Sequence, residues 1–156
     1  MLYSKTCEYA IRALAYMADS KDEGLIMISE ISDQTGVPQA YISKIFQGLV
    51  RNQILTSQRG PAGGFRFKRS PETLTLKEII ESVDDLSWLE ECVMGLNQCD
   101  AGNACPLHYI WTKAKEEMVR KLGRCTLPQL TKEIGQSRYR ELKRSCLNSK
   151  LRLGAA

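Results

Sequence analysis

The chain has 156 residues, of which 43% are hydrophobic and 26% are charged, and its formal net charge is +4. This composition suffices for one hydrophobic core and excludes a chain dominated by disorder. No apolar run reaches the roughly 18 residues of a membrane-spanning helix, so we expect no contact with a membrane. The chain begins Met-Leu-Tyr-Ser without an apolar signal segment, and we therefore expect a cytoplasmic protein.

Charge is distributed unevenly along the chain. Lys and Arg outnumber Asp and Glu in residues 1–70 and 132–156, whereas acidic residues prevail in residues 71–131. Such asymmetry is typical of a protein that meets a polyanion with one part and has another task for the rest.

The N-terminal part of the sequence has the pattern of three helices. Ser4 is a suitable N-cap, and the apolar residues after it recur at helical spacing. A second, short helix fits residues 29–35 and ends at Gly36. Pro38 stands at the start of a third helix, which with the second has the size of a helix-turn-helix. The buried face of the third helix is predicted to consist of Tyr41, Ile45 and Leu49.

The start of the third helix carries side chains that suit the major groove of DNA. Amide, hydroxyl, methyl and ammonium groups match base edges or phosphates. The candidate DNA contacts here are Gln39, Ala40, Tyr41, Ser43 and Lys44. Tyr41 is therefore a candidate both for the core and for the DNA surface.

A hairpin is predicted directly after the third helix. Residues 54–57 and 65–69 have the composition of two short strands around a Gly/Pro-rich turn, which makes a wing. A basic wing suits phosphate contact and insertion of an arginine into the minor groove. Arg59 and Gly60 at the tip, together with Arg66 on the returning strand, complete the predicted DNA-binding set.

A further helix is predicted over residues 75–84, with Thr75 and Glu78 as a capping box. After it come three cysteines and the single histidine of the chain, in the spacing C-x6-C-x5-C-x2-H. These residues are Cys92, Cys99, Cys105 and His108. Thiolates and an imidazole are ligands for an iron-sulfur cluster or for zinc. Burial of all four in a core is the plain alternative, but the Gly, Asn and Asp residues of this loop argue against it.

Apolar residues at helical spacing follow the cysteines over roughly four turns. They are Leu107, Ile110, Trp111, Ala114, Met118 and Leu122. Such a helix needs another surface, and a partner subunit is favoured because winged modules that read DNA normally act as twofold dimers. A short helix is expected after Thr126, and the basic tail beyond it is predicted to be disordered.

Three features together resemble the iron-sulfur transcriptional regulators that include IscR, NsrR and RirA. They are Tyr9-Ala10 in the first helix, the wing sequence 58–65, and the cysteines at 92, 99 and 105. The match covers about residues 1–134. The resemblance implies a homodimeric winged helix-turn-helix repressor or dual regulator, with a long dimerisation helix and a cluster-binding loop that controls DNA affinity.

The resemblance also implies a ligand set. The cysteines at 92, 99 and 105 match the three cysteine ligands of the family. For the fourth ligand, His108 matches the histidine of the IscR-like branch, and Glu8 lies where the NsrR-like branch has an aspartate that reaches the cluster of the other subunit. His108 is favoured because it is close to Cys105 in sequence. Six residues lie between the first two cysteines where IscR-like members tend to have five. A two-iron (2Fe-2S) cluster is favoured over a four-iron one.

Other positions depart from the family motifs or lie outside them. Ser43 stands where the IscR branch has an acidic residue that discriminates between sites, so the target sequence cannot be transferred. Cys7 is expected in the core, whereas Cys125 and Cys146 are unassigned.

The predicted fold is mainly α with a small β-hairpin wing. Residues 1–70 form a winged helix-turn-helix DNA-binding region, residues 71–134 the capping helix, cluster-binding loop and dimerisation helix, and residues 135–156 a basic tail.

The predicted function is a cluster-dependent transcriptional regulator, with repression favoured, which senses iron, redox or nitric oxide status on a pseudo-palindromic operator in double-stranded DNA. Alternatives are a zinc-stabilised or thiol-redox winged-helix regulator and an electron-carrying iron-sulfur protein. An enzyme is not expected, because no nucleophile-base pair, phosphate loop or paired carboxylates stand out.

Overall fold

The chain folds into helices with one hairpin, in the predicted order. The computed structural model describes residues 3–20, 24–60, 62–89, 91–96, 102 and 104–132. The N-terminal elements are α1 (Lys5–Asp19), α2 (Ile28–Thr35), α3 (Gln39–Arg51), β1 (Leu55–Gln58) and β2 (Gly64–Phe67). They are followed by the 3-10 helix η1 (Pro71–Thr73), α4 (Leu76–Val83), the 3-10 helix η2 (Ser87–Leu89) and α5 (His108–Arg124). The mainly helical fold with an antiparallel two-stranded hairpin is thereby confirmed.

The helix ends follow the local signals of the sequence. The Ser4 hydroxyl accepts a hydrogen bond from the Cys7 amide at 3.1 Å and so caps α1. Gly36 ends α2 in the left-handed region, with φ of 70°, where a side chain would be strained. Thr75 and Glu78 form the predicted capping box at the start of α4. α2 begins at Ile28, one residue before the predicted start.

The core lies between α1, α2, α3, α4 and the wing, and it corrects one prediction. The buried residues of α3 are Ile42, Ile45, Phe46 and Leu49. Tyr41 was predicted on this buried face, but its side chain is 54% exposed. The buried residues follow the spacing i, i+3, i+4, i+7, and Tyr41 precedes the first of them by one position, which turns it about 100° away from the core.

Cys7 belongs to this core, as predicted. Its side chain is completely buried. Burial, with a smaller contribution from nearby Asp84, raises the pKa of the thiol to about 12. Cys7 is therefore held as an unreactive thiol at neutral pH.

The wing is fixed to the rest of the DNA-binding region by a pairing that the sequence did not reveal. Ile26 forms an antiparallel bridge with Phe65 in β2, through backbone hydrogen bonds of 2.9 Å in both directions. Gly64 permits this approach, because a Cβ there would lie 2.6 Å from the Ile26 carbonyl oxygen. The Phe65 ring also meets Phe46 of α3 edge to face, with 5.1 Å between centroids. The wing is thus packed directly against α3.

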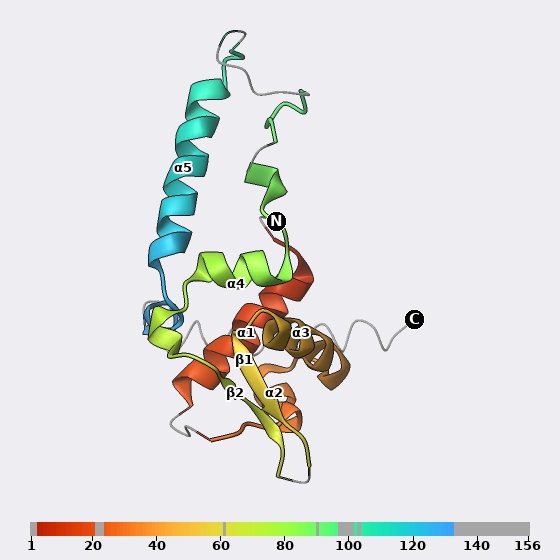
Figure 1. The fold of residues 1–156 in the computed structure, drawn as a ribbon. Helices are drawn as coiled ribbons and strands as arrows, with labels where there is room; N and C mark the ends of the chain where they lie inside the picture. Colours follow the sequence, from red (N-terminus) through yellow and green to blue (C-terminus); the bar gives the residue numbers. More distant parts are fainter. Residues whose placement is uncertain are drawn as a thin grey trace.

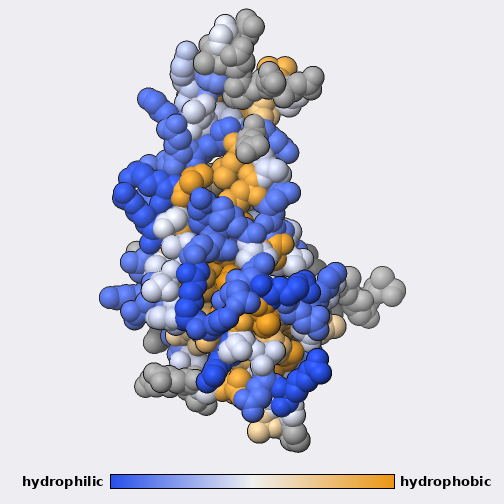
Figure 2. Space-filling model, viewed as in Figure 1, coloured by the Kyte–Doolittle hydropathy of each residue, from blue (hydrophilic) through white to orange (hydrophobic). Residues whose placement is uncertain are grey.

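The molecule is elongated (Figure 1). α4 lies across α1, and α5 extends away from the N-terminal helices with residues 84–89 and 91–96 beside its far half. None of the residues of α5 is buried, and Ile110 is 69% exposed. Figure 2 shows apolar surface open in this upper half of the molecule, flanked by hydrophilic residues.

The short helix predicted after Thr126 is present over residues 127–132, and Leu127 is completely buried in the core. No helix among the described residues is long and apolar enough to cross a membrane. The predicted basic tail, residues 135–156, lies outside the described residues.

Candidate functional site

The predicted DNA-contact residues of α3 lie together at the start of the helix. Gln39, Ala40, Tyr41 and Lys44 are exposed, and Ser43 is half-buried. The Ser43 hydroxyl donates to the Gln39 carbonyl at 2.8 Å, so its remaining capacity is that of an acceptor. α3 begins after Pro38 without a side-chain cap. The first turn therefore presents polar side chains to the outside of the molecule while the opposite face of α3 is buried.

The wing exposes the predicted DNA-contact residues of the hairpin. Arg59, Gly60 and Arg66 are exposed, and within the described part of the chain no ion pair involves either arginine. Gly60 has φ of 117°, a conformation that favours glycine, and its carbonyl accepts from the Gly63 amide at 2.9 Å to close the tip. Two side chains with positive charge are thus available for phosphate or a minor groove.

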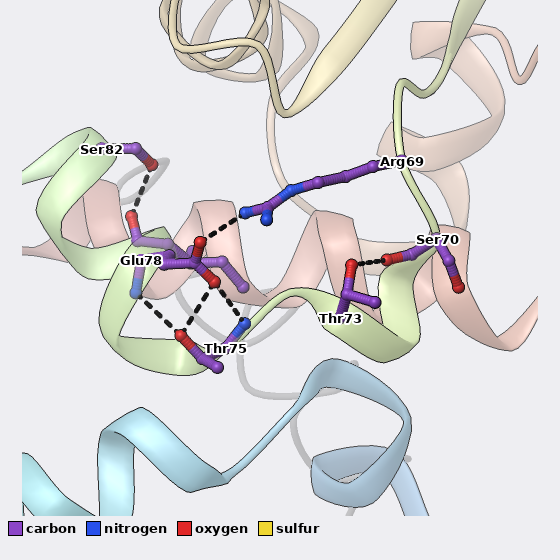
Figure 3. A network of polar contacts seen from close by, with 7 residues as sticks. Arg69, Ser70, Thr73, Thr75, Glu78 and Ser82 are labelled. Atoms are coloured by element: carbon purple, nitrogen blue, oxygen red, sulfur yellow. Dashed lines mark hydrogen bonds and ion pairs between the residues drawn. The ribbon is translucent and has the colours of Figure 1, made fainter.

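Other basic residues near β2 have partners on the protein. Lys68 donates to the Gln53 side-chain oxygen. Arg69 donates to the Glu78 carboxylate at 2.6 Å and so joins the end of the wing to α4. Figure 3 shows this pair together with the Thr75 cap that the same carboxylate completes. Arg69 therefore has a structural partner where Arg59 and Arg66 face outward.

The two described thiols of the cysteine loop, residues 92–105, lie next to backbone groups that are hydrogen-bonded to the start of α5. Cys92 and Cys105 are both half-buried. Next to Cys92, the Glu91 carbonyl accepts a hydrogen bond of 3.0 Å from the indole N–H of Trp111 in α5. The Cys105 carbonyl accepts from the His108 amide at 3.0 Å, which puts His108 on the turn that starts α5. Both ends of the cysteine loop are thus attached to the first turns of α5.

The donor set fits a soft or borderline metal. Cys92, Cys105 and His108 supply thiol and imidazole groups at half-buried positions, which are the ligand types of iron-sulfur and zinc sites. Cys99 lies outside the described residues. Among those that are described, no three His, Cys, Asp or Glu side chains gather closely enough to hold a metal ion. The residue types fit an iron-sulfur cluster or a zinc ion, and no coordination geometry follows from the structure.

Glu8, the alternative fourth ligand, is bound to cations of its own helix. Its carboxylate accepts from Lys5 at 2.7 Å and from the buried Arg12. Glu8 lies near the start of α1, which is also attached to the end of α4, because the Ser4 amide donates to the Asp84 carboxylate at 2.6 Å. Within one chain, the Glu8 carboxylate is therefore held by Lys5 and Arg12.

Two contacts at the site have no clear signal in the sequence. One is the hydrogen bond from Trp111 to Glu91, since the sequence shows Trp111 only as a member of an apolar stripe; the hydrogen-bond donor of the indole was the available hint. The other is an edge-to-face contact of Tyr9 in α1 with Tyr41 in α3. Both join residues that are far apart in the chain, and so periodicity does not predict them.

Comparisons with known proteins indicate a transcriptional regulator. The family model named Rrf2 and described as "Iron-dependent Transcriptional regulator" matches residues 3–133. The HTH-type transcriptional regulator IscR of Xenorhabdus nematophila is 30% identical over 124 residues, which are 80% of this chain and 75% of that protein.

Solved structures share the fold. IscR of T. potens superimposes with a TM-score of 0.67 at 20% identity, over 88% of this chain and 90% of that chain. CymR (YrzC), the global cysteine regulator of B. subtilis, gives a TM-score of 0.69 at 19% identity, over 83% of this chain and 95% of that chain. At these identities the likeness establishes the winged-helix fold.

Proposed function

Because the chain belongs to the Rrf2 family of transcriptional regulators, we propose that it is an iron-sulfur-dependent homodimeric repressor, whose affinity for DNA depends on the state of the cysteine loop. Its relatives are transcriptional regulators and not enzymes. The observation that carries the proposal is the attachment of the cysteine loop to α5 through Trp111 and Glu91, at the opposite end of the molecule from the wing.

The DNA-binding part of the proposal rests on α3 and the wing. Gln39, Ala40, Tyr41, Ser43 and Lys44 would face a major groove, and Arg59, Gly60 and Arg66 would reach backbone or minor groove. The contact of Phe46 with Phe65 keeps these two elements in a constant relation. A rigid pair of reading elements favours a double-stranded operator, and two copies related by a twofold axis favour a pseudo-palindrome.

α4 connects the two ends of the molecule. Near its start, the Leu76 amide donates to the Cys125 carbonyl at 2.9 Å, just beyond the end of α5. Also in the first turn, Glu78 binds Arg69 at the end of the wing. Near its C-terminal end, the Ser82 carbonyl accepts at 2.9 Å from the side chain of Asn52, the C-cap of α3. A shift of α5 would therefore be transmitted to both reading elements, which supports a coupling between loop and operator affinity.

Cys92, Cys99 and Cys105, with His108 as fourth ligand, would hold the cluster, preferably of the two-iron type. The bound group would supply an iron centre that exchanges its weakest ligand and is sensitive to oxidation and nitric oxide. An imidazole binds iron less firmly than a thiolate does, so His108 is the ligand most easily displaced. Glu8 of the partner subunit is the alternative, and it would have to give up its contact with Arg12.

A homodimer through α5 would cover the apolar residues that one chain leaves open. Leu107, Tyr109 and Ile110 at the start of α5 are each more than a third exposed. Isolated exposed apolar residues are common, but several together at the start of a long helix that has no buried residue indicate an interface. A second copy of the chain is the occupant that the family favours.

The test is the iron, acid-labile sulfide and zinc content of the protein purified without oxygen, together with its visible absorption spectrum. Iron and sulfide in equal amounts with a visible charge-transfer band are expected, and their ratio to protein gives the cluster type. Replacement of Cys92, Cys99 and Cys105 together by alanine should abolish the colour and leave a folded dimer. Zinc in place of iron would instead make this a zinc-stabilised regulator, and a coloured triple variant would contradict the proposed ligands.

A further inference from the structure

Tyr41 contacts a residue that lies outside the helix-turn-helix. The ring of Tyr9 in α1 meets the Tyr41 ring edge to face, with 5.9 Å between centroids and 69° between the ring planes. Tyr41 itself is 54% exposed in the first turn of α3. A tyrosine this exposed on a helix surface ordinarily samples several rotamers, and a ring placed against one side of it favours one of them.

Tyr9 is in turn held firmly. Its side chain is half-buried and packs against the hydrophobic core. The Lys5 ammonium lies 5.5 Å from the centroid of the Tyr9 ring, and the same ammonium binds the Glu8 carboxylate at 2.7 Å. Core packing and this cation limit the rotation of the Tyr9 ring. Tyr9 therefore offers Tyr41 a fixed surface, not a second mobile side chain.

We propose that Tyr9 is a positioning residue for sequence reading, which orients Tyr41 for its contact with a base while making no base contact itself. The inference rests on the proposed role of Tyr41 in the major groove. A side chain already held in its binding orientation loses less conformational freedom on binding. This gain in binding free energy applies only where Tyr41 contacts a matching base. Tyr9 therefore contributes to the preference for one DNA sequence and not to the general attraction of DNA phosphates.

The proposal is tested with the duplex that the wild-type protein selects from a randomised pool of double-stranded DNA, and with an unrelated duplex of equal length. Tyr9→Leu should bind the selected duplex about two- to tenfold more weakly, the range expected for loss of one aromatic pair. Binding of the unrelated duplex should stay unchanged. Tyr9→Phe retains the ring and should behave as the wild type.

Tyr16→Leu is the matched control. Tyr16 lies on the same helix, packs against the same core, and has its hydroxyl bonded to Glu30 at 2.7 Å, away from Tyr41. It should lose stability without loss of preference between the two duplexes. Thermal melts followed by circular dichroism establish that each variant folds. If Tyr9→Leu does not fold, Tyr9→Met, which fills most of the same volume with a flexible chain, provides the same comparison.

A double-mutant cycle decides whether Tyr9 acts through Tyr41. Tyr9→Leu combined with Tyr41→Leu should bind the selected duplex no more weakly than Tyr41→Leu alone, because no Tyr41 ring then remains for Tyr9 to orient. Additive losses, or an equal loss on both duplexes, would overturn the inference. If Tyr41→Leu leaves binding of the selected duplex unchanged, the inference fails while DNA binding stands; if the wild type selects no duplex, the proposed function itself fails.

Discussion

At the scale of single residues, the two exposed arginines of the wing differ from the other basic residues around β2. Lys68 and Arg69 are bound to side chains of the protein, whereas Arg59 and Arg66 extend outward. Arg59 follows the end of β1 and precedes a glycine in a conformation that a larger residue would strain. Its backbone therefore has a defined place at the tip, although its side chain is exposed.

Replacement of Arg59 by alanine is expected to weaken binding of the selected duplex by about 1–3 kcal/mol, the usual value of one direct arginine contact. The iron content and visible spectrum should not change, because the wing lies at the opposite end of the molecule from the start of α5. Arg124→Ala, at the exposed end of α5, removes the same charge and serves as control. Electrophoretic mobility shifts measure both. Equal losses in the two variants would reduce the role of the wing to unspecific attraction.

At the scale of elements, α4 depends on its capping box. The Thr75 hydroxyl accepts from the Glu78 amide at 3.3 Å, and the Glu78 carboxylate accepts from the Thr75 amide at 3.0 Å. Thr75→Ala should lower the free energy of unfolding by about 1 kcal/mol, because an amide of the first turn loses its acceptor. Thr73→Ala, whose hydroxyl donates to the Ser70 carbonyl outside any α-helix, is the control. Urea unfolding curves compare the two, and equal midpoints would contradict a capping role.

The Glu78 carboxylate also makes the stability of α4 depend on pH. Its hydrogen bond with the Arg69 guanidinium, and next the Thr75 amide, hold the pKa of Glu78 below its ordinary value of 4.5. A lowered pKa means that the stabilisation is complete above 4.5 and is lost as the pH falls through the folded-state pKa. Glu78→Gln should therefore melt at a lower temperature than the wild type at neutral pH, and the two melting temperatures should converge in acid. A constant difference across that range would contradict this assignment.

At the scale of the whole molecule, α5 extends from the cysteine loop to α4, and its apolar side is the proposed contact with a second chain. Ile110→Glu introduces a charge at the most exposed apolar position of α5 and should dissociate the dimer. Glu116→Lys changes the charge of a residue on the other side of α5 and should leave the dimer intact. Analytical ultracentrifugation distinguishes one chain from two. A dimeric Ile110→Glu variant would exclude this part of α5 from the interface.

Dissociation would also reduce operator binding, because a single chain reaches only one half-site. Ile110→Glu should accordingly lose the selected duplex while retaining weak binding of unrelated DNA. This outcome distinguishes loss of the dimer from loss of DNA contacts by α3 or the wing. In the second case the dimer stays intact. The same comparison in Arg59→Ala is expected to show an intact dimer.

The sequence by itself determined most of the local architecture. Ser4, Gly36 and the Thr75–Glu78 pair mark helix ends because capping involves only neighbouring residues. The wing follows from alternation around a Gly/Pro turn, and the three cysteines with His108 indicate a soft metal site by residue type alone. Each of these signals depends on interactions within a few positions of the chain.

Only the tertiary structure decided which surfaces meet. Tyr41 is at helical spacing from core residues, and its exposure was settled by which face of α3 packs against α1 and the wing. The Ile26–Phe65 pairing and the Trp111–Glu91 hydrogen bond likewise join distant positions. The physical reason is that a periodic pattern specifies one face of an element, whereas the partner of that face depends on the packing of the whole chain.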